Sequence, residues 1–152
     1  MPLKPQRIVA EFAHYIPNNY RIHLDAGNTW AWFTHYFHRE CTKGYYHIAM
    51  GFGSMGWAIG SAIGSCLGSR EPSVCITGDG SYLMSGQEIT VALQHCIPVI
   101  YVILNDSELG MVKHGQLLGG AEQVGFELPV ISYAKIAQAM NIEGIKVSTP
   151  EE

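Results

Sequence analysis

Charged residues are scarce in this sequence: they make up 14% of its 152 residues, against about a quarter in an average soluble protein. Hydrophobic residues make up 47%, which excludes a disordered chain and supplies enough apolar surface for the core of one domain. An excess of positive charge is also absent, since the formal net charge is −4. That balance argues against a general nucleic-acid binder, and we expect no nucleic-acid partner.

Signals for metal-binding cysteines and for export are lacking too. The four cysteines show no CxxC or comparable spacing, and the seven histidines are scattered without a zinc pattern. The first twelve residues contain no apolar segment of the kind that a signal peptide needs. We therefore expect a cytoplasmic protein with buried, reduced thiols. The cysteines are Cys41, Cys66, Cys75 and Cys96.

Glycine, by contrast, is abundant, with 17 residues. Residues 48–69 carry no charge, and a glycine recurs there at every fourth position from Gly56 to Gly68. This spacing also occurs in packed transmembrane helices, but six glycines and four serines dilute the hydrophobicity of the segment. We favour a water-soluble helix, expect no membrane span, and expect the glycine face to let another backbone approach, so that the helix is buried on more than one side.

The hydrophobic periodicity predicts alternating helices and strands. Apolar residues recur with helical spacing over residues 5–16 and about 133–140, and helices are also expected at the aromatic segment 30–38 and at about 110–118. Short apolar runs predict strands at residues 21–24, near 46–50 and at 145–147. This alternation predicts an α/β fold in three layers, with a parallel sheet flanked by helices.

The clearest unit lies between residues 73 and 104. Residues 73–78 read as a strand, 78–81 as a turn, and Ser85 with Glu88 as a capping box that opens a helix. The apolar face of that helix consists of Ile89, Ala92, Leu93 and Cys96. The apolar run at 97–104 is typical of a strand buried on both faces, so the segment forms a βαβ unit.

The last five residues, STPEE, have the composition of a helix start: a Ser or Thr N-cap, a proline in the first turn and two acids. We therefore interpret residues 1–152 as one domain and expect it to be a fragment truncated at its C-terminal helix.

Two strand ends carry acidic residues. Asp79 follows the strand at 73–78, and Asp106 follows the run at 97–104. Neighbouring parallel strands bring such ends together, where ligands of open α/β sheets bind. Two carboxylates suit Mg²⁺, which completes its octahedron with phosphates and water, and the glycines beside Asp79 let backbone N–H groups approach a phosphate. The sequence therefore favours a magnesium–phosphate site there.

A competing motif lies at residues 51–56, which fit the G-x-G-x-x-G fingerprint of dinucleotide-binding proteins. The acid of that fingerprint should close the second strand. Glu71, twenty residues after Gly51, instead precedes the next strand. We therefore regard NAD or FAD binding at this loop as the weaker alternative.

The segments GDGSYLMSGQE and IPVIYVILNDSELGMVK together resemble the cofactor signature of thiamine diphosphate (ThDP) enzymes. GFGSMGWAIGSAIGS and LDAGNTWAW resemble two earlier segments of the same family. The similarity extends over about residues 5–150 and is nearest to the acetolactate synthase group, specifically its C-terminal ThDP-binding (PP) domain.

The resemblance implies a role for each matching residue. Mg²⁺ would be bound by the carboxylates of Asp79 and Asp106 and by the main-chain carbonyl of Glu108. Met55 would support the bent cofactor, and the Gly53 carbonyl would accept a hydrogen bond from its aminopyrimidine. Further cofactor contacts would come from Ala26, Gly27, Asn28, Thr29, Gly80, Ser81, Leu109 and Met111. Met111 and Val112 would line the reaction pocket and, with Met55, count as catalytic.

Three positions depart from the family pattern. Asp106 stands where the family usually has Asn, which adds a negative charge facing the diphosphate. Val112 stands where simple decarboxylases have a glutamate, which fits carboligation better than protonation. Gly115 stands where acetolactate synthases of branched-chain synthesis have a tryptophan, so the substrate is expected to differ.

The resemblance implies a ThDP- and Mg²⁺-dependent carboligase or decarboxylase, a transferase or lyase, acting on a small 2-keto acid. Its activating glutamate would come from a PYR domain on another chain or missing from this sequence, so the isolated domain should be inactive. A homo-oligomer is also expected, and FAD only in a full-length enzyme. The alternatives are the PP subunit of a split 2-keto acid decarboxylase and a non-catalytic cofactor-binding fragment.

Overall fold

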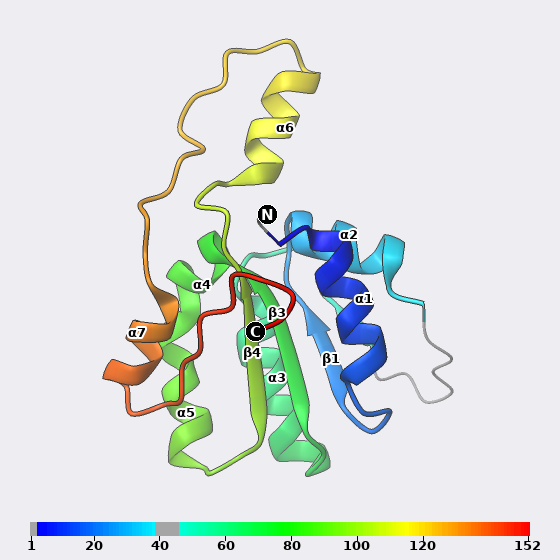
Figure 1. Ribbon diagram of the computed structural model, residues 1–152, viewed down its shortest axis with the longest axis vertical. Helices are drawn as coiled ribbons and strands as arrows, with labels where there is room; N and C mark the ends of the chain where they lie inside the picture. The colour runs from blue at the N-terminus through cyan, green and yellow to red at the C-terminus, as the bar shows by residue number, and fades with distance from the viewer. Residues whose placement is uncertain (1–2, 39–45) are drawn as a thin grey trace.

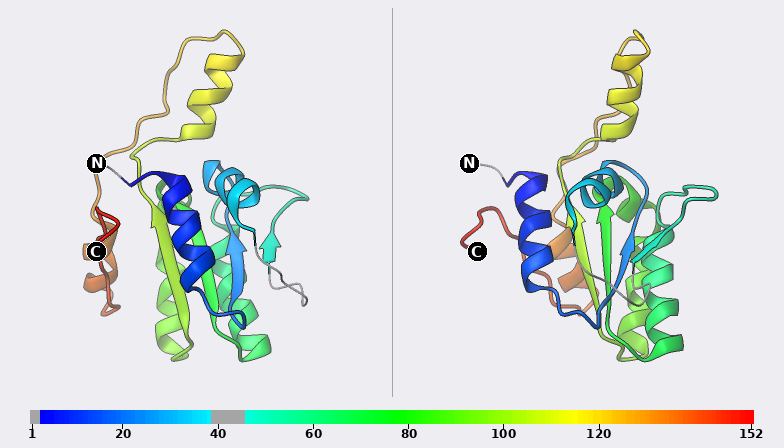
Figure 2. Two further views of the ribbon diagram at one scale, coloured as in Figure 1. Left: turned by 45° about the vertical axis from the view of Figure 1, so that its right-hand side comes forward. Right: turned by 90° about the vertical axis from the view of Figure 1, so that its right-hand side faces the viewer.

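The computed structural model describes residues 3–38 and 46–152, which form three layers around a parallel sheet (Figures 1 and 2). The strand order is β2-β1-β3-β4, and each neighbouring pair runs parallel. The strands are β1 (Arg21–Leu24), β2 (Tyr46–Ile48), β3 (Ser73–Gly78) and β4 (Val99–Leu104). This confirms the predicted fold class and the strands expected in these four regions.

Helices cover both faces of the sheet. α1 (Pro5–Tyr15) and α2 (Asn28–Tyr36) cover one face. α3 (Trp57–Ser69), α4 (Asp79–Ser85), the short 3₁₀ helix η1 (Gly86–Glu88), α5 (Ile89–Gln94) and α7 (Tyr133–Ala139) lie on the opposite side. The side chains of β3 alternate between the two layers: Val74 and Ile76 pack with the α1–α2 side, and Cys75 packs with the α3 side.

One helix departs from the layers. α6 (Gly110–Leu118), at the position predicted for it, projects beyond the carboxyl ends of the strands together with the loop that returns from it (Figure 1). None of its residues is buried. This arm rises from the edge of the sheet where the acidic strand ends lie, so its base borders the candidate site.

The segment after β3 differs from its prediction. Residues 78–81 are not a free turn, because α4 begins at Asp79 with Gly78 as its N-cap. Ser85 is the last residue of α4 and the N-cap of η1, and its side chain forms no capping hydrogen bond, so the predicted capping box is wrong. Of the predicted apolar face, Ile89 and Ala92 are buried, whereas Leu93 and Cys96 are exposed.

The prediction that β4 is buried on both faces is confirmed only in part, because its side chains pack against both apolar cores but none of its residues is fully buried. In the described sheet β4 is an edge strand, because β3 is its only neighbour, and the Ile100 side chain is exposed. Residues 145–147 form no strand, and Ile145 and Val147 are exposed. Residues 149–151 form a turn, in which the Glu152 carboxylate accepts hydrogen bonds from the backbone N–H groups of Ser148 and Thr149.

The glycine face of α3 is open within the described residues. Gly60, Gly64 and Gly68 are exposed, and a Cβ added at each would meet nothing within 4 Å. The opposite face packs on the sheet through Ala58, Ile59, Ala62, Ile63 and Cys66. Among the described residues, α3 is therefore buried on one side only, whereas the sequence predicted burial on more than one side.

Two further sequence predictions can be compared with the described residues. No helix among them has the length and apolar character needed to cross a membrane. Cys66 and Cys75 are buried as expected, whereas Cys96 is exposed and Cys41 lies outside the described residues.

Two histidines sit side by side in the sheet. His23 of β1 and His47 of β2 are register partners, and their rings stack with centroids 4.7 Å apart. Nδ1 of His23 lies 2.9 Å from Ser61 Oγ on α3, while the Nε2 atoms of both rings are buried without a partner among the described residues. Burial, with the nearby charges of His47 and Arg21, lowers the pKa of His23 to about 3, and burial also lowers the pKa of His47.

This pair predicts acid sensitivity. Each histidine has a lower pKa in the folded protein than in the unfolded chain. The free energy of unfolding therefore has its full value above the unfolded pKa and falls as the pH drops toward the folded pKa. We expect the free energy of unfolding to fall below about pH 6.5, by up to about 1.4 kcal/mol per pH unit for each histidine. Urea titrations between pH 7.5 and 4.5 measure this loss. His23→Phe should reduce the slope, and the exposed His95→Gln should retain it; equal slopes in all three proteins would contradict the assignment.

Candidate functional site

The candidate site lies at the carboxyl edge of the sheet, where all three aspartates of the sequence follow strands (Figure 1). Asp25 follows β1, Asp79 follows β3 and Asp106 lies two residues after β4. The strand order β1-β3-β4 makes their strands consecutive neighbours. The predicted meeting of the two acidic strand ends, Asp79 and Asp106, is therefore realised, with Asp25 as a third acid alongside.

Asp25 is the most enclosed of the three, with no exposed surface. Its Oδ2 accepts hydrogen bonds from Thr77 Oγ1 at 2.7 Å and from the Gly56 N–H at 3.1 Å. Its Oδ1 accepts from the N–H groups of Ala26 at 3.1 Å and Ala58 at 3.5 Å. Burial raises the pKa of Asp25 even though these hydrogen bonds act in the opposite direction. The carboxylate thus joins the ends of β1 and β3 to the start of α3.

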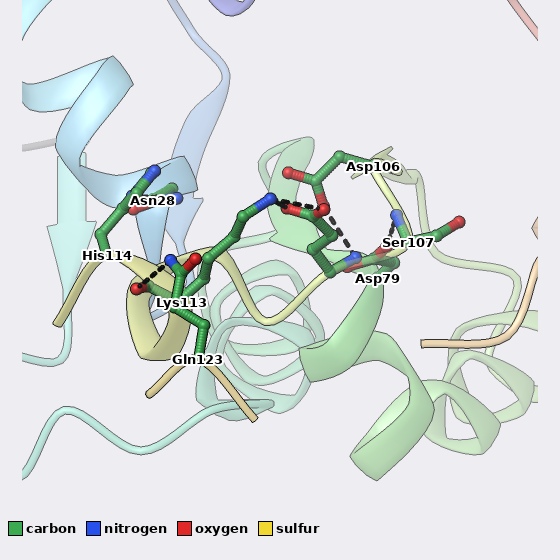
Figure 3. Close-up of polar contacts among 8 residues, drawn as sticks. Asn28, Asp79, Asp106, Ser107, Lys113, His114 and Gln123 are labelled. Carbon is green, nitrogen blue, oxygen red and sulfur yellow. Dashed lines mark hydrogen bonds and ion pairs between the residues drawn. The ribbon is translucent and has the colours of Figure 1, made fainter. Parts of the chain in front are cut away.

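Asp79 links the second and third strand ends. Its Oδ1 accepts a hydrogen bond from the N–H of Gly80 at 2.8 Å. Its Oδ2 accepts one from the N–H of Ser107 at 2.7 Å (Figure 3). The residue is 3% exposed. Each carboxylate oxygen has two lone pairs, so these two hydrogen bonds leave both oxygens able to accept a further ligand.

Asp106 lies close by and is more exposed. Its Oδ1 accepts a hydrogen bond from the N–H of Glu108 at 3.2 Å. Partial desolvation, and then the negative charge of Asp79, raise the pKa of Asp106. Two carboxylates that repel one another in this way form a site that favours a cation.

The donor chemistry of this edge fits Mg²⁺ and a phosphate group. Asp79 and Asp106 offer hard oxygen ligands, and the Ser81 hydroxyl is buried without a hydrogen-bond partner among the described residues. A buried hydroxyl without a partner is unfavourable unless something binds it. Within residues 3–38 and 46–152, however, no three His, Cys, Asp or Glu side chains form a ready metal-binding group. A complete site would need backbone or ligand oxygens as well.

Gly80 lies under a small apolar group. A Cβ at this position would stand 2.5 Å from Leu109 Cδ2 and 3.2 Å from Met55 Cε. Both side chains therefore cover the backbone beside Asp79. The structure thus brings together Met55, Gly80 and Leu109, which come from three separate segments. Gly53, on the loop before Met55, has a positive φ of 68° and is exposed.

The turn at residues 26–29 approaches the base of α6. The Asn28 amide occupies the space that a Cβ on Gly110 would need, and it lies 3.5 Å from His114 Nδ1 (Figure 3). Gly27, the N-cap of α2, has φ 118°, a conformation that favours glycine. Thr29 is buried, while Ala26 and Asn28 are partly exposed. The turn at 26–29, for which the family resemblance implies cofactor contacts, therefore lies beside the start of α6.

Met111 and Val112 remain apart from this group. Both lie on α6 with side chains about half exposed, 47% and 43% respectively. The family resemblance implies that Met111 and Val112 line the reaction pocket. Among the described residues, no pocket encloses their side chains.

Sequence reasoning missed Asp25, Thr77 and Lys113. A usable signal for Asp25 was its position directly after the strand predicted at 21–24, the same position that Asp79 has after its strand. No sequence signal showed that Thr77 would reach it, because the two residues are 52 positions apart. Lys113 makes an ion pair with Glu108, with Nζ 2.7 Å from Oε1.

Residues 25–152 match the family model described as "Thiamine pyrophosphate enzyme, C-terminal TPP binding domain". The chain belongs to this family of ThDP-binding domains. It is 39% identical over 105 residues to the acetolactate synthase large subunit of Haemophilus influenzae, covering 67% of this chain and 18% of that protein. It is also 30% identical over 152 residues to the sulfoacetaldehyde acetyltransferase of Alcaligenes xylosoxydans xylosoxydans, covering 99% of this chain and 25% of that enzyme.

A solved structure shows the same fold. The ThDP-dependent 4-hydroxybenzoylformate decarboxylase of Rhodococcus jostii superposes with a TM-score of 0.88 at 24% identity, covering 99% of this chain and 28% of that one. The chain spans about a quarter of the length of the curated relatives that it matches over its whole length. The family match favours ThDP over a dinucleotide as the cofactor of this domain.

Asp25→Asn tests the link between strand ends. The amide would place an NH₂ donor among groups that are themselves donors, so we expect the free energy of unfolding to fall by about 2–3 kcal/mol. Thr77→Val, which removes one of the four hydrogen bonds, should lower it by about 1 kcal/mol. Chemical denaturation measures both, with the exposed Thr90→Val as control. An Asp25→Asn protein as stable as wild type would contradict the assignment.

Proposed function

We propose that this chain binds ThDP together with Mg²⁺ at the carboxyl edge of its sheet, as the cofactor-binding part of a 2-keto acid carboligase or decarboxylase. The observation that carries the proposal is the paired acidic edge: Asp79 is hydrogen-bonded across to Ser107, beside Asp106 and beside the unpartnered Ser81 hydroxyl. This arrangement supports a metal–diphosphate site.

The cofactor would be held by groups from several segments. The carboxylates of Asp79 and Asp106 and the main-chain carbonyl of Glu108 would bind Mg²⁺. The diphosphate would be held by Gly80 and Ser81 and by the turn at 26–29, whose Asn28 lies beside Gly110. The closeness of these segments at one edge of the sheet supports this assignment.

The organic part of the cofactor would lie against the loop before α3. The Gly53 carbonyl would accept a hydrogen bond from the aminopyrimidine, and Met55, with Leu109, would support the bent cofactor. The packing of Met55 and Leu109 over Gly80 supports this placement. When bound, ThDP supplies the electron sink for reactions beside a carbonyl group. Met111 and Val112 would border the substrate on the arm.

The substrate class follows from the same positions. Val112 offers no proton donor, which favours transfer to a second carbonyl over protonation, and Gly115 leaves more room than an aromatic residue would. Among the relatives are an acetolactate synthase and a sulfoacetaldehyde acetyltransferase, and the second name describes transfer of an acetyl group. We therefore propose a small 2-keto acid as the donor.

Catalysis would further require a PYR domain, either on another chain or elsewhere in a longer protein, and FAD would bind only in such a longer protein. Matched relatives about four times as long as this chain support this proposal. We propose that residues 1–152 form the PP domain, that it is inactive alone, and that it assembles into a homo-oligomer in the cytoplasm.

ThDP with Mg²⁺ should stabilise the protein against heat. At a ligand concentration about a hundredfold above Kd, the gain is about 2.7 kcal/mol, or a rise in Tm of about 5–10 °C for a domain of this size. Asp79→Asn should abolish the rise, and Glu122→Gln, on the exposed loop, should retain it. The Tm of each variant without ligand separates damage to the fold from loss of binding. No shift in the wild type would overturn the cofactor proposal.

Asp106 should make ThDP binding depend steeply on Mg²⁺. Without the metal, its carboxylate and that of Asp79 repel the diphosphate. Calorimetric titrations of ThDP at several Mg²⁺ concentrations should show a steep change in Kd for the wild type. For Asp106→Asn the change should be smaller, by on the order of tenfold. An affinity independent of Mg²⁺ in the wild type would argue against the proposed metal site.

A further inference from the structure

The loop after β4 is held by a second segment of chain. The Leu109 N–H donates to the Phe126 carbonyl at 2.6 Å, and the Leu128 N–H donates to the Ser107 carbonyl at 2.8 Å. Between these hydrogen bonds, Glu108 and Glu127 form an antiparallel bridge. Residues 107–109 are thus paired with 126–128, and this pairing shapes the loop that contains the proposed ligands Asp106 and Glu108.

Lys113 spans both sides of this pairing. From α6, its Nζ donates to both carboxylate oxygens of Glu108 at 2.7 Å (Figure 3). The same ammonium group lies 4.9 Å from the centroid of the Phe126 ring, within the range of a cation–π interaction. The Lys113 and Glu108 side chains are only 31% and 33% exposed. One cation therefore connects α6, the ligand loop and the returning segment.

Lys113 also compensates negative charge around the loop. Asp79, Asp106 and Glu108 are close enough for the negative charges of Asp79 and Glu108 to raise the pKa of Asp106. Lys113 balances the Glu108 carboxylate directly. It also donates to both oxygens of that carboxylate, which ties the Glu108 side chain to α6.

We propose that Lys113 is a positioning residue for the metal site: its ion pair with Glu108 and its contact with Phe126 pre-form the loop that supplies Asp106 and the Glu108 carbonyl. The proposal rests on the proposed ThDP–Mg²⁺ function. Lys113 acts through its contacts with Glu108 and Phe126. Removing its charge should loosen the loop and raise the concentration of Mg²⁺ that ThDP binding requires.

The first test needs no cofactor. Hydrogen exchange should be measured at the Leu109 and Leu128 amides in wild type, Lys113→Met, Lys113→Arg and the exposed control Lys135→Met. We expect exchange at both amides to accelerate about threefold to tenfold in Lys113→Met, in proportion to the loss of a well-oriented, partly buried ion pair. Lys113→Arg and Lys135→Met should stay near wild type. Unchanged exchange in Lys113→Met overturns the proposal.

The second test measures the metal requirement. The Mg²⁺ concentration for half-maximal ThDP binding should rise about threefold to tenfold in Lys113→Met. Lys113→Arg should restore it, and adding Glu108→Gln to Lys113→Met should cause no additional loss because the two residues act as one pair. Faster exchange with an unchanged Mg²⁺ requirement overturns the positioning role.

Asp79→Asn separates the two levels of failure. If wild type binds ThDP with Mg²⁺, Asp79→Asn does not, and Lys113→Met matches wild type, then the proposed function stands and the role of Lys113 is overturned. If wild type itself shows no Mg²⁺-dependent ThDP binding, the proposed function fails, and the role of Lys113 fails with it.

Discussion

The buried carboxylate of Asp25 is the interaction on which the rest of this edge depends. A charge with no exposed surface is unfavourable unless donors surround it, and here a hydroxyl and three backbone N–H groups do so. Those donors lie just after β1, on β3 and at the start of α3. Satisfying one charge therefore fixes how the two central strands end and where the glycine-rich loop turns into helix.

The three aspartates show how environment separates structural acids from ligand-binding ones. Asp25 is enclosed by donors and has little capacity left for a ligand. Asp79 is buried but accepts from only two N–H groups, and Asp106 is exposed and accepts from one. The number of hydrogen bonds that compensate each carboxylate therefore decreases from the buried Asp25 to the exposed Asp106. A cation is favoured beside the least compensated carboxylates.

Much of this arrangement could be predicted from the sequence. The alternation of apolar periods indicated the parallel sheet, and the acids after two apolar runs indicated the edge where Asp79 and Asp106 meet. Local patterns failed where tertiary contacts decide. Ser85 and Glu88 match a capping box, but α4 already occupies the preceding residues. The run at 97–104 is apolar enough for a central strand, but only the sheet order shows that β4 has a single neighbour.

The candidate site was predictable in outline, since the strand ends follow from the sheet and the individual roles from a family resemblance. The side-chain links could not be predicted, because residues distant in sequence form them.

α6 shows why these side-chain links matter. It has nine residues and none is buried, and helices of fewer than about twelve residues are marginal without packing. Hydrogen bonds from Gln116 to Val124 and from Gln123 to Lys113 join it to the returning loop. The arm therefore depends on polar contacts, and the same contacts place Lys113 over the loop that contains Glu108.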